Sequence, residues 1–126
     1  MTMRTPLKMA RNLGSAKEGA DHFWKQRVTG VANLVLGLFL VWLIASLIGS
    51  DHSAVKAKLA NPIIAMALLA LVVSGTIHMR LGMQTIIEDY VHGDGTKVVC
   101  LMLNTFFAAA IAIACTFAVL KLSFGA

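Results

Sequence analysis

The chain has few charged residues for its length. Of its 126 residues, 13% are Asp, Glu, Lys or Arg and 58% are hydrophobic, and the mean hydropathy is +0.78. Soluble domains contain about 25% charged residues, so this shortage excludes an ordinary soluble globular protein. It also leaves no segment polar enough to form a soluble catalytic domain. The composition therefore indicates an integral membrane protein.

Cysteine and acidic residues are also scarce. The two cysteines, Cys100 and Cys115, share one apolar segment at a spacing that suits neither a metal site nor a disulfide. We interpret them as small packing residues. Residues 1–17 contain no Asp or Glu, which is typical of a transit peptide but equally of an uncleaved basic tail with a short interfacial helix.

Three apolar segments reach the length of about 20 residues that a membrane-spanning helix needs. They are Val28–Gly49, Pro62–Ile87 and Val98–Leu120, separated by the short connectors Ser50–Asn61 and Glu88–Lys97. The sequence therefore predicts an all-α membrane protein, with a basic tail at 1–27 and a three-helix transmembrane domain at 28–126. Three helices bury little surface among themselves, so we expect partner subunits and membrane lipid to complete the packing.

The basic residues lie at membrane edges and are distributed unequally. Eight lie in the N-terminal tail or near the second connector, and three lie near the first connector or the C-terminus. The positive-inside rule then predicts that the N-terminus and the second connector are inside. The positive charges form no patch with interleaved aromatics, so the net charge of +5 does not indicate nucleic-acid binding.

His78 is a titratable side chain within the second apolar segment, where such groups are costly and usually functional. Leu71, Ser74, Gly75, Gly82, Thr85 and Asp89 fall on the same helical face. Because small residues flank His78 on this face, a wide, flat group such as a haem could lie against the backbone there, with His78 as an axial ligand. Two alternatives stay open: a histidine hydrogen-bonded to a neighbouring helix, and a proton-relay group.

Two acids, Glu88 and Asp89, end the second segment and are followed by Tyr90. A helix C-terminus disfavours negative charge, so acids at this position favour a functional site over a solvated helix end.

In the first segment, Thr29, Asn33 and Gly37 form a stripe typical of a helix–helix contact. Arg27, at the membrane edge, can extend to headgroups or neutralise a bound anionic group.

The run His78-Met79-Arg80-Leu81-Gly82-Met83-Gln84-Thr85-Ile86-Ile87-Glu88-Asp89-Tyr90-Val91 resembles the second-helix signature of the hydrophobic membrane anchors of succinate dehydrogenase, respiratory complex II. Arg27-Val28-Thr29-Gly30 is similar to the opening of the first helix in that family. The likeness extends over most of the chain, since three spans and an inside N-terminus also agree.

This resemblance implies specific site residues. His78 would be one axial ligand of a haem b that is shared with a sister cytochrome b anchor subunit. Arg27 would pair with a haem propionate. Tyr90 would donate a hydrogen bond to ubiquinone, and Asp89 would support the local hydrogen-bond network and proton delivery.

The resemblance also implies the partners, a flavoprotein subunit and an iron–sulfur subunit docked on the inner side. By itself the chain would not be catalytic. Two other readings remain: a haem-free structural anchor, and a small proton-coupled transporter that uses His78 and Asp89. We expect a multi-pass protein of a bacterial inner membrane rather than a mitochondrial one.

Overall fold

The computed structural model describes residues 6–7 and 18–124, and every regular element in 18–124 is an α-helix. The helices are α2 (Glu18–Ala45), α3 (His52–Leu59), α4 (Pro62–Tyr90) and α5 (Asp94–Ser123). Three of them, α2, α4 and α5, are long and apolar enough to cross a membrane. The prediction of an all-α membrane protein is confirmed. The interfacial helix expected in the N-terminal tail falls almost entirely outside the described residues.

The three long helices extend beyond the apolar segments. α2 begins at Glu18 and α5 at Asp94, several residues before the apolar segments, and α4 ends at Tyr90. The 29 residues of α4 cover about 44 Å, which matches the thickness of a bilayer that includes its headgroup regions. Glu88, Asp89 and Tyr90 are therefore helical, and the connector to α5 is shorter than the sequence predicted.

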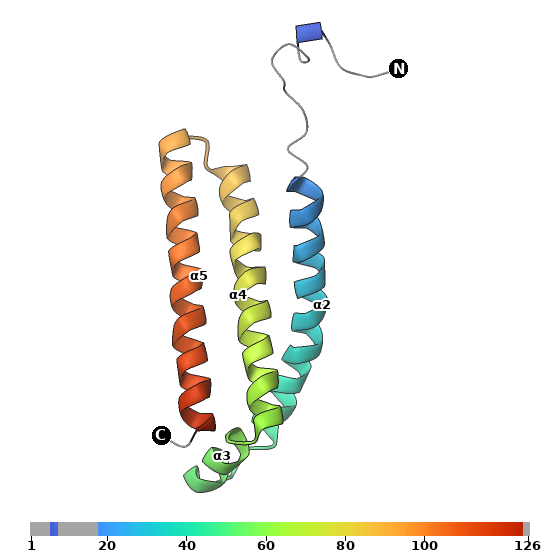
Figure 1. Cartoon of the computed structure of the whole chain (residues 1–126), viewed down its shortest axis with the longest axis vertical. Coiled ribbons are helices and arrows are strands. Elements are labelled where there is room, and N and C mark those ends of the chain that lie inside the picture. The colour runs from blue at the N-terminus through green and yellow to red at the C-terminus, as the bar shows by residue number, and fades with distance from the viewer. Residues whose placement is uncertain (1–5, 8–17, 125–126) are drawn as a thin grey trace.

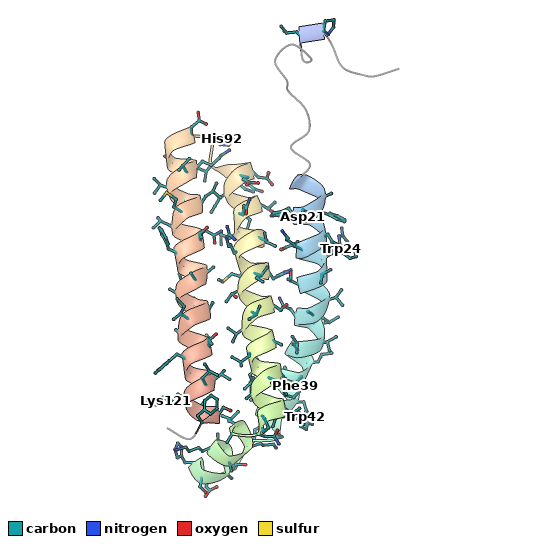
Figure 2. All side chains as sticks on the ribbon, viewed as in Figure 1. Asp21, Trp24, Phe39, Trp42, His92 and Lys121 are labelled. Atoms are coloured by element: carbon teal, nitrogen blue, oxygen red, sulfur yellow. The ribbon has the colours of Figure 1, made fainter. Side chains whose placement is uncertain are left out.

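Two tryptophans lie towards opposite ends of α2. Trp24 and Trp42 are 66% and 57% exposed, and Figure 2 shows both on the outside of the helix, with Phe39 next to Trp42. Their separation of eighteen residues corresponds to about 27 Å, close to the hydrocarbon thickness of a bilayer. This is the usual placement of interfacial aromatic residues at the two surfaces of a membrane.

The first connector contains a helix that the sequence analysis did not predict. Asp51 caps α3 by accepting hydrogen bonds from the Ala54 amide (3.1 Å) and the Ser53 hydroxyl (2.8 Å). Lys58, in the last turn, donates to the Ser46 hydroxyl at 2.8 Å and lies over the Trp42 ring. The short helix is thereby fastened to the end of α2 (Figure 1).

The long helices form a row with α4 in the middle (Figure 1). α4 contacts both α2 and α5, whereas α2 and α5 do not contact each other within the described chain. The layer is therefore one helix thick, and few of its side chains are buried: Leu43, Ala65, Leu81, Ile87, Asn104 and Ala108. Both broad faces of the central helix remain available to other molecules.

The contact between α4 and α5 is built around Asn104 and Ala108, which are 8% and 5% exposed. The Asn104 side-chain amide donates to the backbone carbonyl of Arg80 at 2.9 Å. A buried amide paired with a neighbouring helix is typical of membrane proteins. Asn104 and Ala108 therefore serve the packing of α5 against α4.

Candidate functional site

His78 lies in the middle of α4 and faces α2. Its ring atom Nδ1 is 3.1 Å from the hydroxyl oxygen of Thr29, which comes from a helix 49 residues earlier in the chain. The Thr29 hydroxyl also lies 2.7 Å from the backbone carbonyl oxygen of Lys25 on its own helix. The two elements that position the histidine are therefore the first and second spans.

The Thr29 contacts favour a proton on Nδ1 of His78. A hydroxyl has one hydrogen, and the carbonyl oxygens of Lys25 and Gln26 lie 2.7 and 3.2 Å from the Thr29 hydroxyl oxygen and can accept it. With that hydrogen donated to its own helix, the oxygen can accept an Nδ1–H of His78 at 3.1 Å. Neutral imidazole in this tautomer leaves a lone pair on Nε2, which has no hydrogen-bond partner among the described residues. Metal-binding histidines commonly use this arrangement, in which one ring nitrogen is held and the other binds the metal.

The glycines around His78 fall into two groups. A Cβ at Gly30 would lie 3.4 Å from Cε1 of His78, so the ring packs against this backbone. A Cβ at Gly82 would lie 3.2 Å from the Gln26 side chain. Gly75 and Gly37 have nothing within 4 Å. The expected flat, open face is therefore covered by α2 at Gly82 and open at Gly75, one turn before His78.

Three polar atoms of α2 are buried without a hydrogen-bond partner in the described part of the chain. They are Nε2 of His22, Oε1 of Gln26 and Oδ1 of Asn33. Asn33 belongs to the stripe predicted for a helix–helix contact, but its Oδ1 finds no partner across that contact among the described residues. Buried polar groups in proteins nearly always have partners, so these three atoms are unsatisfied polar groups on the helix that packs against α4.

Arg27 is exposed at the edge of the same region, with its guanidinium carbon 4.4 Å from the centre of the Phe23 ring. It lines a cavity of about 390 Å³ together with Gly19, His22, Phe23, Gln26 and Thr85. The guanidinium forms no ion pair within residues 18–124. A charge held over an aromatic face can still accept a carboxylate as partner.

Asp89 and Tyr90 stand at the end of α4. Tyr90 is 77% exposed and Asp89 is also exposed, and neither makes a hydrogen bond with another described residue. The Glu88 carbonyl accepts from Lys97 of α5 at 3.1 Å, which offsets the unfavourable placement of acids at this terminus. The phenol and carboxylate groups are therefore free to meet groups from outside the chain.

His22 and Gln26 were not predicted as site residues from the sequence. Both precede the apolar segment that marked the first span, so they were assigned to the tail. His22 and Gln26 are four residues apart, and the same helical spacing leads on to Gly30 and Asn33. These residues therefore share the stripe of α2 that faces α4. That spacing was the signal that could have revealed them.

The residues around His78 fit a haem. The imidazole has a fixed ring and a free Nε2, the backbone is open at Gly75, and Arg27 can meet an acidic substituent at the membrane edge. The described residues contain no group of three or more His, Cys, Asp or Glu side chains that could hold a metal ion. An iron at His78 would therefore need ligands from a macrocycle and from another chain.

Residues 1–120 match the family described as succinate dehydrogenase/fumarate reductase transmembrane subunit. No solved structure matches the chain.

Several proteins named succinate dehydrogenase hydrophobic membrane anchor subunit are similar to it. The one from Paracoccus denitrificans is 32% identical over 122 residues, which are 97% of this chain and 94% of that protein. The one from Rickettsia bellii is 35% identical over 88 residues, 70% of each chain. The one from Rickettsia conorii is 40% identical over 86 residues, 65% of this chain and 66% of that protein.

The three apolar helices and these mostly bacterial relatives together identify a multi-pass inner-membrane protein. The chain belongs to the family of succinate dehydrogenase/fumarate reductase transmembrane subunits.

Proposed function

We propose that this chain anchors the flavoprotein and iron–sulfur subunits of a succinate:ubiquinone oxidoreductase, and that it forms a haem b site and part of a ubiquinone site with a sister anchor subunit. The chain is a succinate dehydrogenase membrane anchor subunit by its family and by the names of its relatives. The observation that carries the finer proposal is the Thr29–His78 contact at 3.1 Å.

His78 would hold the haem iron through Nε2. Thr29 would keep the ring in one tautomer and one orientation, and Gly30 allows the ring edge to approach the backbone of α2. When bound, a haem b would supply a one-electron carrier between the soluble subunits and the quinone region.

Arg27 would neutralise a propionate of that haem. The exposed guanidinium over Phe23 lies at the membrane edge, where a propionate that extends from a buried macrocycle would emerge. An arginine–carboxylate pair is well suited to this task because the guanidinium can form two parallel hydrogen bonds.

Tyr90 and Asp89 would serve the quinone. The phenol can donate a hydrogen bond to a quinone carbonyl and so stabilise negative charge that develops on that oxygen during reduction. The neighbouring carboxylate is exposed to the aqueous phase and can take up and pass on protons. The proposed inside location of this helix end, inferred from the distribution of basic residues, puts the quinone on the side where electrons and protons arrive.

The experiment that tests this proposal is a reduced-minus-oxidised absorbance spectrum of the complex purified in mild detergent. We expect the wild-type complex to show a b-type signal and the His78→Ala variant to lose it. The exposed His52 provides the control, since His52→Ala should keep the full signal. A His78→Ala complex with an unchanged spectrum would leave the haem-free structural anchor as the better description.

A further inference from the structure

A groove runs between α2 and α4 on the side of the layer that is turned away from Arg27. Its deeper part is an apolar cavity of about 510 Å³, bordered by Val28 and Leu36 at its two ends on α2. Its outer part is a polar cavity of about 550 Å³, and Lys25 is part of its lining. Lys25 and Arg27 are two residues apart, which places them about 160° apart around the helix.

The two cavities are consecutive parts of this one groove. Their lining residues on α2 follow a single stripe, which contains Asp21, Lys25, Val28, Ala32 and Leu36. Their lining residues on α4 do the same and include Val73, Ile77, Leu81, Gln84 and Glu88. Spacings of three and four residues belong to one helical face. A single elongated molecule can therefore extend through both cavities.

The length of the groove matches one leaflet of a bilayer. Trp24, an interfacial aromatic residue, marks the level of the membrane surface at this end of α2. The polar cavity is at the same level, since Asp21 and Lys25 flank Trp24 in the chain. The apolar cavity extends from Val28 to Leu36, about 6–18 Å from Trp24 along the helix. Half of the hydrocarbon core is about 15 Å thick.

The polar cavity carries charges of both signs, with one acid in excess. Lys25 and Asp21 form an ion pair at 2.7 Å. The Glu88 carboxylate is exposed and accepts a hydrogen bond from the neutral Gln84 amide at 2.8 Å. Lys97 donates to the backbone carbonyl of Glu88, and the carboxylate forms no ion pair within residues 18–124. The cavity therefore suits a ligand that brings a cationic hydrogen-bond donor.

The apolar cavity suits a hydrocarbon chain better than a protein helix. The two hydroxyls at its edge are already engaged, since Thr29 can donate within α2 and Ser74 donates to the Thr29 carbonyl at 3.2 Å. A helix with a diameter of about 10–12 Å would need about 1,000 Å³ over the eight-residue rise from Val28 to Leu36. This is about twice the volume of the cavity. An extended acyl chain is much thinner and can lie inside it.

We infer that this groove binds a phospholipid with a primary-ammonium headgroup, of the phosphatidylethanolamine class, and that one acyl chain occupies the apolar cavity. The ammonium group donates to the Glu88 carboxylate. The phosphate meets Lys25, whose ammonium has three hydrogens and needs only one of them for Asp21.

The charges of the polar cavity also select among headgroups. A choline headgroup has no N–H to donate, and no aromatic ring among the described lining residues could hold it by a cation–π contact. An anionic headgroup, such as glycerol phosphate, supplies no cation for Glu88 and adds negative charge beside two acids. The ethanolamine headgroup alone of these three matches both Lys25 and Glu88.

The test is photo-labelling of the whole complex in nanodiscs of unlabelled phosphatidylcholine. Three probes carry the same diazirine-labelled acyl chain and differ only in an ethanolamine, choline or glycerol headgroup, and the adducts are mapped by mass spectrometry. We expect the ethanolamine probe to label residues 28–36 and 69–77 about tenfold more than either of the others. Equal labelling by the three probes, a preference for another headgroup, or no adduct in these segments would each overturn the inference.

Charge variants test the headgroup contact. Glu88→Gln keeps the size of the side chain and should lower labelling by the ethanolamine probe about tenfold, to the level of the choline probe. Asp94→Asn removes another exposed acid at the same end of the layer and is the control, with labelling unchanged. Full ethanolamine labelling of the Glu88→Gln complex would refute the ammonium contact.

A variant that fills the groove tests the acyl chain. Ala70 is exposed and lines the apolar cavity, so Ala70→Phe should lower labelling of residues 28–36 at least fivefold with every probe. Ala109 is exposed on α5 and lines neither part of the groove, so Ala109→Phe should leave labelling intact. Unchanged labelling of the Ala70→Phe complex would show that the chain lies elsewhere.

The outcome is independent of the proposed haem, because the groove and the Arg27 cavity lie on opposite sides of the layer. A complex without a b-type spectrum could still show the ethanolamine preference. Loss of that preference with an intact spectrum would refute only the lipid site.

Discussion

At the residue scale, Thr29 connects two helices through one hydroxyl group. It donates to a carbonyl of its own helix at 2.7 Å and meets His78 at 3.1 Å. A Thr hydroxyl that bonds to its own backbone usually serves only its own helix. Here the same bond leaves the oxygen able to accept from the imidazole, so that a contact within α2 favours one tautomer of a ring on α4.

We expect Thr29→Val to weaken haem binding by about 10- to 100-fold, because Nδ1 of His78 would lose its acceptor and the ring would lose its fixed tautomer. The measurement is the haem-to-protein ratio of the purified complex as detergent concentration is increased. Thr76→Val is the matched control, since the Thr76 hydroxyl contacts only the carbonyls of Val72 and Val73 on its own helix. Equal haem loss in both variants would contradict the role of Thr29.

The sequence predicted the importance of His78 but not its neighbour. A titratable residue in an apolar segment is visible without a structure, and so is the helical face on which it lies. The pairing of Thr29 with His78 depends on the axial register of α2 against α4, and the sequence alone does not determine that register. For the same reason Arg80 was counted only as a topological charge, and the hydrogen bond from its Nε to the Thr105 hydroxyl of α5 was not foreseen.

At the element scale, α3 shows how a short connector becomes ordered. Its eight residues contain no buried side chain, so packing contributes little to the stability of α3. The helix is instead stabilised by interactions at its two ends. Asp51 supplies the N-terminal cap, and the Lys58 side chain reaches Ser46 and Trp42 at the other end. The hydropathy pattern missed this helix because a short helix held by its termini has no apolar periodicity.

The cap of α3 should depend on pH. Hydrogen bonds from the Ser53 hydroxyl and the Ala54 amide lower the pKa of Asp51 below its ordinary value of 3.8. A depressed pKa in the folded state means that the cap stabilises α3 above that ordinary value and is lost as the pH falls through the lower, folded-state pKa.

We therefore expect Asp51→Ala to speed amide hydrogen exchange in the first turn of α3 near neutral pH. The difference between the variant and the wild type should begin to shrink below about pH 3.8 and disappear as the pH falls through the lower, folded-state pKa of Asp51. The amides of Ala54 and Val55 are the probes, and the amides of α5 serve as the internal reference. A difference between the two proteins that persists unchanged at the lowest pH would contradict the cap.

The lengths of the long helices were only partly predictable. Apolar runs located the three spans, since length and hydropathy are sequence properties. They did not locate the ends, because a helix continues through the headgroup region where polar residues are favourable. His22 and Gln26 were consequently assigned to a tail, although both lie on the face of α2 that packs toward α4.

At the scale of the whole molecule, the exposed end of α4 is where the proposed quinone chemistry meets other subunits. Tyr90 is the only tyrosine of the chain and makes no hydrogen bond within the described residues. The proposed role of Tyr90 as a hydrogen-bond donor to ubiquinone comes from the resemblance in sequence. The structure adds that its hydroxyl is exposed and can donate to another molecule. The groups that would complete a quinone pocket belong to partner chains, so neither sequence nor isolated structure could predict the pocket itself.

We expect Tyr90→Phe to lower quinone reductase activity of the complex about a hundredfold, the usual effect of removing one hydrogen-bond donor from a developing oxyanion. Succinate oxidation with a soluble artificial acceptor should remain near the wild-type rate. His92→Ala, an exposed change in the connector that follows (Figure 2), should leave both rates intact. If Tyr90→Phe reduces the two activities equally, its phenol serves assembly instead of quinone chemistry.

The row of helices also has a consequence for biosynthesis. Every contact between long helices joins spans that are neighbours in the chain, since α2 and α5 do not touch within the described residues. The hairpin of α2 and α4, with its Thr29–His78 bond, can therefore be complete while α5 is still inside the ribosome. α5 then adds at one edge, and a haem-binding partner would need to wait only for the first two spans to leave the translocation channel.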